Sequence, residues 1–223
     1  MNASLHGVGM LVAAALAYTH VSTAEPTTTL VEIAGGGIGK PPADFQFHRT
    51  GQGDLGRWTV VRDPTALYGY AIEHVSTDQH DDRFPLAIYK PLAGENVEVS
   101  VRFKIISGTM QSAGLAVGVR TPSDYYALSA SALEHSVSAL LFVNGKSKRI
   151  DSAEAEVVIN RWHTMGVVMD DDHLKISLDH KLLFTTYDWT RRKDGRVALW
   201  TQEDNVSRFD QLTLRELPPT RWK

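Results

Sequence analysis

The chain has 223 residues, of which 43% are hydrophobic and 22% charged, which is enough apolar material for one domain with a full core. Its net charge of -3 comes from 23 basic and 26 acidic residues spread along the sequence. No basic stripe of the kind that a phosphate backbone requires is present, so nucleic acid is not expected as a partner. The absence of cysteine excludes disulfides, thiolate zinc sites and a cysteine nucleophile.

The first 24 residues have the pattern of a signal peptide. An apolar run extends from about Val8 to Tyr18, and Ser22 and Ala24 supply the small residues that a signal peptidase requires. The run is shorter than the roughly 20 apolar residues of a membrane-spanning helix. Because no Lys or Arg precedes it, a membrane tether or an irregular start is the alternative. We expect cleavage after Ala24, a secreted or periplasmic bacterial protein, and no membrane span after removal of the signal.

Residues 25–43 are predicted to form a linker, because their glycines and prolines disfavour regular structure. The stretch GGGIGK within it lacks the spacing of a phosphate-binding loop, and Pro41-Pro42 follow it instead of a helix. The folded domain is expected over residues 44–217, with a short tail at 218–223.

The domain has the patterns of short strands. Residues 97–105 alternate strictly between apolar and polar side chains, as in a half-buried strand. Asn144-Gly145 predicts a tight hairpin turn. Residues 163–187 predict three strands, separated by the turn-forming groups 170–172 and 179–180. No amphipathic helix stands out, so the sequence predicts an all-β fold, an antiparallel two-sheet sandwich of the jelly-roll type.

Two acidic groups have the composition of cation ligands. The first gathers six residues within ten positions: Glu73, His74, Asp78, His80, Asp81 and Asp82. They could hold a divalent cation if the loop folds over it, but their spacing matches no defined site, and a polar surface loop is the favoured interpretation. The second is Asp170 to Asp172, which could bind calcium, although turn chemistry explains it better. The sequence thus predicts no cofactor, with calcium left open.

The C-terminal hairpin, residues 194–214, holds the candidate sugar site. A period of two places Val197 and Leu199 inward and Trp200 outward. An outward indole offers a flat apolar face to a pyranose, and three polar residues follow it: Gln202, Asp204 and Arg208. The alternative is that Trp200 packs under a loop and the polar residues form a turn.

Other large hydrophobic residues of this chain have simpler interpretations. Phe209 and Leu212 are three residues apart, which breaks the period of two and predicts a bulge. Trp58, Trp162 and Trp189 lie next to apolar strand residues and are predicted to be core. Trp222 lies in the tail.

The order of the strands resembles a known family. The segments "INRWHTMGVVMDDDHLKISLDHKLLF" and "DGRVALWTQEDNVSRFDQLTL" are similar to the concanavalin A-like lectin/glucanase jelly rolls, in particular to laminin-G-like domains and to the exported bacterial branch related to 3-keto-disaccharide hydrolase domains. The resemblance covers roughly residues 44–217. It implies a curved two-sheet jelly roll, a carbohydrate partner and a monomer, with Tyr126 and Arg102 as further sugar-binding candidates.

The sequence also departs from that family's pattern. Polar residues that the family carries near Val117, Ser129 and Ser131 are replaced here by small or apolar ones, and the paired carboxylates Glu-x-Asp-x-(x)-Glu of jelly-roll glucanases are missing. Glu134 and His135 are the remaining acid/base candidates. Two functions stay open: a noncatalytic carbohydrate-binding, lectin-like module, and a hydrolase or lyase acting on a modified disaccharide or glycoside. Whether the chain is an enzyme is not decided by its sequence.

Overall fold

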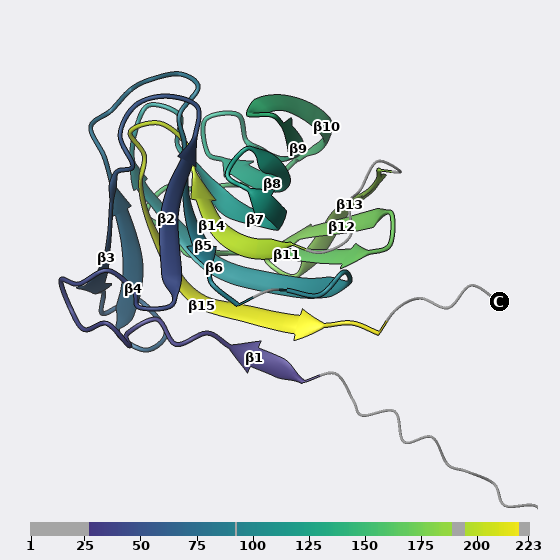
Figure 1. Ribbon diagram of the computed structural model, residues 1–223. Helices are drawn as coiled ribbons and strands as arrows, with labels where there is room; N and C mark the ends of the chain where they lie inside the picture. Colours follow the sequence, from purple (N-terminus) through teal and green to yellow (C-terminus); the bar gives the residue numbers. More distant parts are fainter. Residues whose placement is uncertain (1–26, 92, 189–194, 219–223) are drawn as a thin grey trace, which may run out of the picture.

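The computed structural model describes residues 27–91, 93–188 and 195–218 (Figure 1). These ranges contain 15 β-strands, and no helix occurs in them. Accordingly, the described part of the chain contains no helix suited to crossing a membrane. The predicted signal peptide, Trp189 and Trp222 lie outside the described residues.

The strands form two antiparallel sheets. Sheet A has the order β13 (Lys181–Tyr187), β12 (His173–Leu178), β11 (His163–Asp170), β6 (Val97–Ser107), β15 (Val206–Glu216), β4 (Tyr70–Val75) and β3 (Arg57–Arg62), and β1 (Thr28–Leu30) also pairs with β15. Sheet B has the order β10 (Lys146–Glu154), β9 (Ser136–Val143), β8 (Asp124–Ser131), β7 (Ser112–Thr121), β14 (Arg196–Thr201), β5 (Phe84–Tyr89) and β2 (Phe45–Thr50). The predicted all-β sandwich is confirmed.

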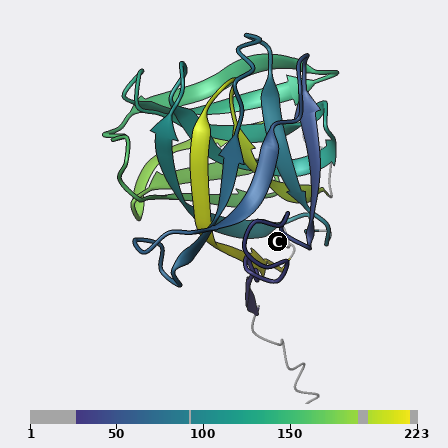
Figure 2. The same cartoon turned by 90° about the vertical axis from the view of Figure 1, so that its left-hand side faces the viewer.

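The main core lies between the two sheets. Val97, Val99, Val101, Phe103 and Ile105 of β6 are buried there, as their alternation predicted. Alternate residues of β11 and β12 in sheet A, and of β7 and β8 in the facing sheet B, belong to the same core. Figures 1 and 2 show how the N-terminal strands β2 to β5 close one side of this sandwich.

Three predicted irregularities of the backbone are confirmed. Asn144 and Gly145 both have positive φ, 50° and 78°, as a tight primed hairpin turn requires. Asp179 and His180, at 49° and 66°, make the same kind of turn between β12 and β13. The register of β15 against β6 shifts between Asp210 and Thr213, which is the bulge predicted from the spacing of Phe209 and Leu212.

Part of the segment predicted to be a linker belongs to the sheet. Residues 28–30 pair with β15, and Val31 behind them is only 3% exposed.

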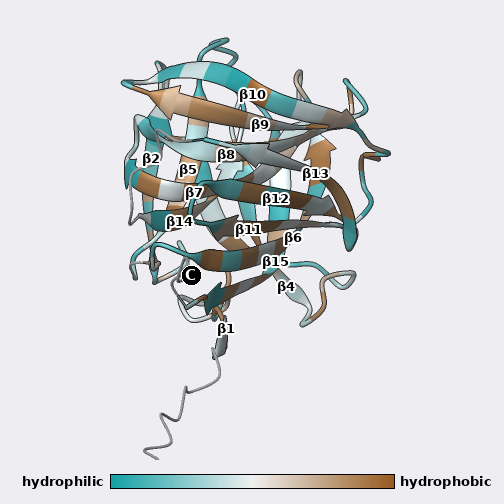
Figure 3. Cartoon of the chain, turned by 90° about the vertical axis from the view of Figure 1, so that its right-hand side faces the viewer, coloured by the Kyte–Doolittle hydropathy of each residue, from teal (hydrophilic) through white to brown (hydrophobic). Residues whose placement is uncertain are grey.

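The two outer strands at the other end of the sandwich are β10 and β13. Strand β10 is coloured mostly hydrophilic in Figure 3, in agreement with its exposed Lys146, Lys148 and Arg149. Such charges protect an open sheet edge from pairing with another chain.

Candidate functional site

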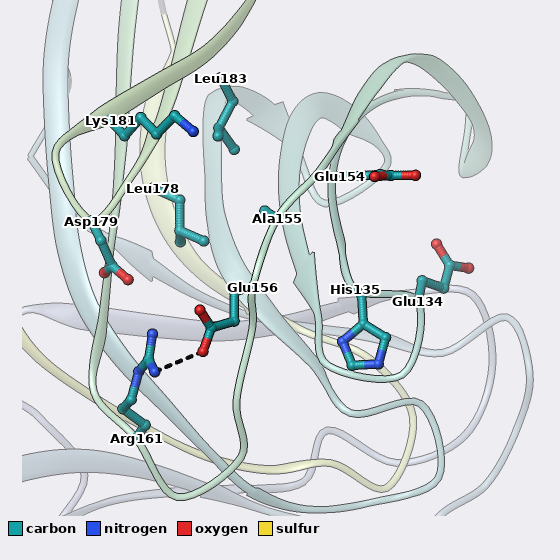
Figure 4. A pocket seen from close by; sticks show the side chains of 10 residues that line it. All are labelled: Glu134, His135, Glu154, Ala155, Glu156, Arg161, Leu178, Asp179, Lys181 and Leu183. Carbon is teal, nitrogen blue, oxygen red and sulfur yellow. Dashed lines mark hydrogen bonds and ion pairs between the residues drawn. The ribbon is translucent and has the colours of Figure 1, made fainter.

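A pocket of about 840 Å³ opens where the edge strands β10 and β13 approach each other. We call it the edge pocket. Its walls come from the β8–β9 turn, the connection that leaves β10, and the β12–β13 hairpin (Figure 4). The lining residues are Glu134, His135, Glu154, Ala155, Glu156, Arg161, Leu178, Asp179, Lys181 and Leu183. The predicted acid/base candidates Glu134 and His135 therefore do lie together in a pocket.

Polar groups of both signs face this space. Arg161 Nη1 donates to Glu156 Oε1 at 3.0 Å, and both side chains remain largely exposed. Glu134 accepts a hydrogen bond of 3.0 Å from Arg149 Nη2. The four lining carboxylates outnumber the two lining cations, Arg161 and Lys181, so the pocket has a net negative charge. Leu178 and Leu183 add an apolar patch beside the charged groups.

Asp179 and His163 form a pair that has the look of a catalytic dyad. His163 Nδ1 donates to Asp179 Oδ2 at 2.8 Å, and Thr164 N donates to the other carboxylate oxygen. However, His163 Nε2 accepts the Val158 N–H at 3.0 Å, and the ring is only 1% exposed. Both ring nitrogens are therefore occupied, and this histidine cannot take a proton from a substrate. The pair instead fixes the β12–β13 hairpin in place.

Trp200, the predicted sugar-stacking residue, lies on the outward face of sheet B as expected. The prediction that its ring is open to a sugar is wrong, because the side chain is 0% exposed. It stacks on Phe84 with ring centroids 5.8 Å apart, and Phe84 packs edge-on against Phe142 at 4.9 Å. Phe142 in turn stacks on Tyr125 at 4.4 Å. We call these four rings the ring cluster; it forms a second apolar core on the outside of sheet B.

The polar residues after Trp200 organise the loops at this end of the sandwich. Asp204 accepts hydrogen bonds from Thr109 N, Thr109 Oγ1 and Gln79 Nε2, at distances between 2.7 and 3.0 Å. Gln202 Nε2 donates to its neighbour Glu203. The predicted site residues Gln202 and Asp204 thus have turn and loop contacts, which is the alternative interpretation of this segment.

Arg102 and Arg208 lie on the opposite side of the molecule, on the outer face of sheet A. Arg208 Nη1 donates to Asp63 at 3.0 Å, and its Nε donates to Glu73 at 2.8 Å. Arg102 Nη1 donates to Asp210 at 3.1 Å, and Lys104 Nζ donates to Asp63 at 2.6 Å. We call this group the charged face; its members are Asp63, Glu73, Arg102, Lys104, Arg208 and Asp210. Neither arginine comes near Trp200.

Trp162, which was predicted to lie in the core, covers part of the charged face. Trp162 is only half-buried, and its Nε1 donates to Thr65 Oγ1 at 2.9 Å. The Arg102 guanidinium and the Lys104 ammonium lie 4.9 and 4.7 Å from its ring centroid, within range of cation–π attraction. The prediction for Trp162 was therefore wrong, whereas Trp58 is in the core as predicted, at 3% exposure.

Tyr126 lies in neither of these places. It is 5% exposed in the core between the sheets, and its hydroxyl donates to Asp188 Oδ2 at 2.7 Å. The six sugar-binding residues predicted from the sequence are thus spread over both outer faces, one loop and the interior. They do not form one site.

The predicted cation ligands also separate. Glu73 pairs with Arg208, whereas His74 points inward, where its Nδ1 donates to the Asn205 carbonyl at 2.8 Å. Burial lowers the pKa of His74 to about 4. Asp170 to Asp172 form the β11–β12 turn, in which Asp171 has a φ of 49°. No group of three or more His, Asp or Glu side chains within residues 27–91, 93–188 and 195–218 is arranged to hold a metal ion. The expectation of no cofactor, with calcium left open, stays a prediction.

Several edge-pocket residues were missed in the sequence. Glu156, Arg161 and Lys181 belong to a connection and a turn that are distant along the chain, and their conjunction depends on the approach of two sheet edges. The only local signal is the clustering of charges in "DSAEAEVVINR", residues 151–161.

Comparisons with solved structures identify the architecture. The carbohydrate-binding module CBM66 from Bacillus subtilis has a TM-score of 0.61 and 16% identity, over 76% of this chain and 95% of that one. The exoplasmic/lumenal domain of VIP36, in its Ca2+/Man-bound form, has a TM-score of 0.56 and 10% identity, over 88% of this chain and 92% of that one. A Bacillus subtilis protein with a galectin-like fold has a TM-score of 0.52 and 11% identity, over 79% and 91% of the two chains.

No family model matches the sequence, and no curated protein matches it. At the identities of the three structures, the likeness establishes the fold alone. The fold is a two-sheet jelly roll like that of these three structures, as the sequence predicted.

Proposed function

We propose that this chain is a noncatalytic carbohydrate-binding domain that holds a glycan in the edge pocket. The observation that carries the proposal is the convergence of hydrogen-bonding side chains from three chain segments in one open space of about 840 Å³. Pockets for small ligands commonly measure roughly 300 to 1,000 Å³. The neighbouring folds support the same class of ligand, since they include a carbohydrate-binding module and a Man-bound domain.

The chemistry of the lining suits sugar hydroxyls. Each hydroxyl can donate and accept, so a sugar site needs groups of both kinds. Glu134, Glu156 and Asp179 provide acceptors, while Arg161 and Lys181 provide donors. The paired Arg161 and Glu156 present a donor and an acceptor side by side, which matches two adjacent hydroxyls of one ring. Leu178 and Leu183 are placed to contact the C–H face of the sugar.

The charge of the edge pocket restricts the class of sugar that it can bind. Four carboxylates and two cations favour neutral or amino sugars and disfavour uronic acids and sulfated sugars, which would add negative charge to a negative site. We therefore expect neutral glycans to bind best.

Binding without hydrolysis is supported by the acid groups themselves. Glycoside hydrolysis needs a proton donor and a second carboxylate that is free to act as nucleophile or base. Three of the four lining carboxylates already accept hydrogen bonds: Glu134 and Glu156 from an arginine, and Asp179 from His163 and Thr164. His163 has no free ring nitrogen. The alternative function, a hydrolase or lyase of the 3-keto-disaccharide type, is favoured by one observation: Glu134 and His135 line the same pocket.

The cellular setting is part of the same proposal. The signal-peptide pattern supports export to the periplasm or the medium, with Glu25 as the first residue of the mature chain. The exposed charges of the edge strand β10 support a monomer, because they oppose pairing with a second sheet.

The proposal is tested with the purified chain on a glycan array, with and without calcium, followed by calorimetry on the best ligand. Arg161→Ala should weaken binding about tenfold or more, because a charged hydrogen bond contributes roughly 1.5 to 3 kcal/mol. Arg57→Ala is the matched control, since Arg57 is also exposed but lies on β3. Equal affinity of Arg161→Ala and wild type would contradict the proposal. Release of reducing sugar that is lost in Glu134→Gln would establish the hydrolase instead.

A further inference from the structure

Strand β15 changes partners halfway along its outer side. Ser207 to Phe209 pair with β4, and Thr213 to Arg215 pair with β1. Between these stretches, Asp210 and Gln211 pair with neither of the two strands. The bulge lies at the same point, and Gln211 has a φ of 50°. The chain therefore leaves an opening in the sheet, and such gaps between diverging elements are where ligands commonly bind.

A pocket of about 430 Å³ occupies this opening. We call it the bulge pocket. Its lining residues are Leu30, Val31, Glu32, Ile33, Ala34, Tyr68, Tyr70, Asp210 and Gln211. The β3–β4 connection supplies Tyr68, whose side chain is 62% exposed, and the segment after β1 supplies the aliphatic wall. None of these residues lines the edge pocket.

The bulge pocket includes a buried carboxylate with a free acceptor. Asp210 is 1% exposed, and its Oδ2 accepts hydrogen bonds from Leu67 N at 2.8 Å and from Arg102 Nη1 at 3.1 Å. Its Oδ1 is buried and has no partner in the described part of the chain. A buried acceptor without a partner lacks the hydrogen bond that most buried polar atoms have, so a ligand that donates to it would be favoured. Burial also raises the pKa of Asp210.

The charges around the pocket are balanced. Asp210 and Glu32 line it, and two arginines lie beside it: Arg102 bonds to Asp210, and the Arg62 guanidinium lies 5.9 Å from the Tyr70 ring centroid. A charged ligand of either sign would therefore meet a like charge near the pocket. A neutral ligand that donates one hydrogen bond and offers an apolar face fits better.

We propose that the bulge pocket is a second sugar-binding site, which takes one neutral pyranose residue. In the bound state a ring hydroxyl donates to Asp210 Oδ1, which is closed to solvent in the free chain, so the lining shifts to admit the hydroxyl. The C–H face of the sugar packs on Tyr68. The choice of a sugar rests on the proposed function, but the site itself uses none of the edge-pocket residues. A chain with two separate sugar sites binds a polymeric glycan more tightly than either site alone, because the second contact is intramolecular.

The experiment uses nitrogen-15 labelled protein and three probes: the methyl glycosides of glucose, galactose and mannose. Each is added up to about 20 mM, a concentration high enough to occupy a site with a Kd of about 1 mM. We expect shifts of the amide signals of Tyr68, Tyr70 and Gln211 with at least one glycoside. Absence of these shifts with all three overturns the proposal.

Variants then assign the site. Tyr68→Ala should weaken the glycoside binding reported by Gln211 about tenfold, while Tyr187→Ala, which removes a tyrosine of similar exposure at 57%, should leave it unchanged. Equal effects of the two variants overturn the proposal. The same glycoside binding is measured a second time in Asp210→Asn. This change keeps the volume of the side chain and removes the charge of the group that accepts the sugar hydroxyl.

The same data separate this proposal from the edge pocket. Arg161→Ala should leave the Gln211 response intact. If Gln211 responds and no glycan affinity depends on Arg161, the bulge pocket stands and the edge pocket fails. If only Arg161 matters, the bulge pocket fails and the proposed function stands.

Discussion

The outer faces of the two sheets are built on opposite principles. Sheet B carries the ring cluster, in which Trp200 is fully buried, whereas sheet A carries the charged face, which the half-exposed Trp162 covers. Both tryptophans lie in or next to strands with a clear period of two. The difference shows that alternation decides the side of a sheet on which a residue lies, and that the residues packed above it decide whether it reaches solvent.

Small residues explain why sheet B can bury a large ring on its outside. Gly114 is the cross-strand partner of Trp200, and Ala116 is the partner of Ala198. A Cβ at Gly114 would lie 1.9 Å from the Leu128 carbonyl oxygen, so only glycine fits beside Trp200 at this point of the sheet, and Phe84 covers the indole. Sheet A has long charged side chains in the equivalent layer, and they neutralise one another in pairs.

The largest expected effect comes from the ring cluster. Trp200→Ala should lower the free energy of unfolding by about 3 to 5 kcal/mol, because it leaves a cavity beneath Phe84. Urea denaturation followed by circular dichroism measures the change. Where the variant remains folded, its glycan affinity should equal that of wild type, since Trp200 lines neither pocket. A loss of stability below about 1 kcal/mol would mean that the ring is not structural.

The second-largest loss of stability is expected from a substitution in the charged face. Burial alone would raise the pKa of Asp63, but hydrogen bonds from Lys104, Thr65 and Arg208 outweigh it and hold the pKa well below its usual value. Asp63→Asn should therefore cost about 3 kcal/mol at pH 7, because Lys104, 7% exposed, loses its carboxylate. Asp44→Asn, at an exposed site, is the control.

The pH dependence of that loss has a definite sign. Because the folded pKa of Asp63 is lowered, its stabilisation is complete above the ordinary value of 3.8 and is lost as the pH falls below it. The difference in unfolding free energy between wild type and Asp63→Asn should shrink from pH 7 to pH 3. A constant difference over that range would show that the charge of Asp63 does not stabilise the fold.

The smallest effect is expected at Trp162. Its replacement by Ala removes two cation–π contacts and one hydrogen bond at a half-exposed position, so we expect a loss of about 1 kcal/mol. Urea denaturation again gives the value. If Trp162→Ala proves more damaging than Trp200→Ala, the contrast between the two faces is incorrect.

Much of the fold could be predicted because it depends on local patterns. The alternation of residues 97–105, the turn residues Asn144-Gly145 and the spacing of Phe209 and Leu212 each determine the backbone nearby. The edge pocket could not be predicted in the same way. Glu134, Arg161 and Lys181 lie together only because the edges of the two sheets approach each other. The distance between those edges cannot be read from any local sequence pattern. The exposure of Trp200 was predicted wrongly for a related reason, since Phe84 covers its ring from a strand more than 100 residues earlier.

The pairing of β1 with β15 has a consequence for how the chain folds. Strand β15 contacts β1, β4 and β6, so the first and the last strands of the described chain must both be present before sheet A is complete. Contacts this distant in sequence slow the search for the native state, and sandwiches rich in them fold in roughly milliseconds to seconds. We therefore expect a ribosome-bound fragment that lacks residues 206–216 to remain without a complete sheet A, and folding to finish only after synthesis has passed this strand.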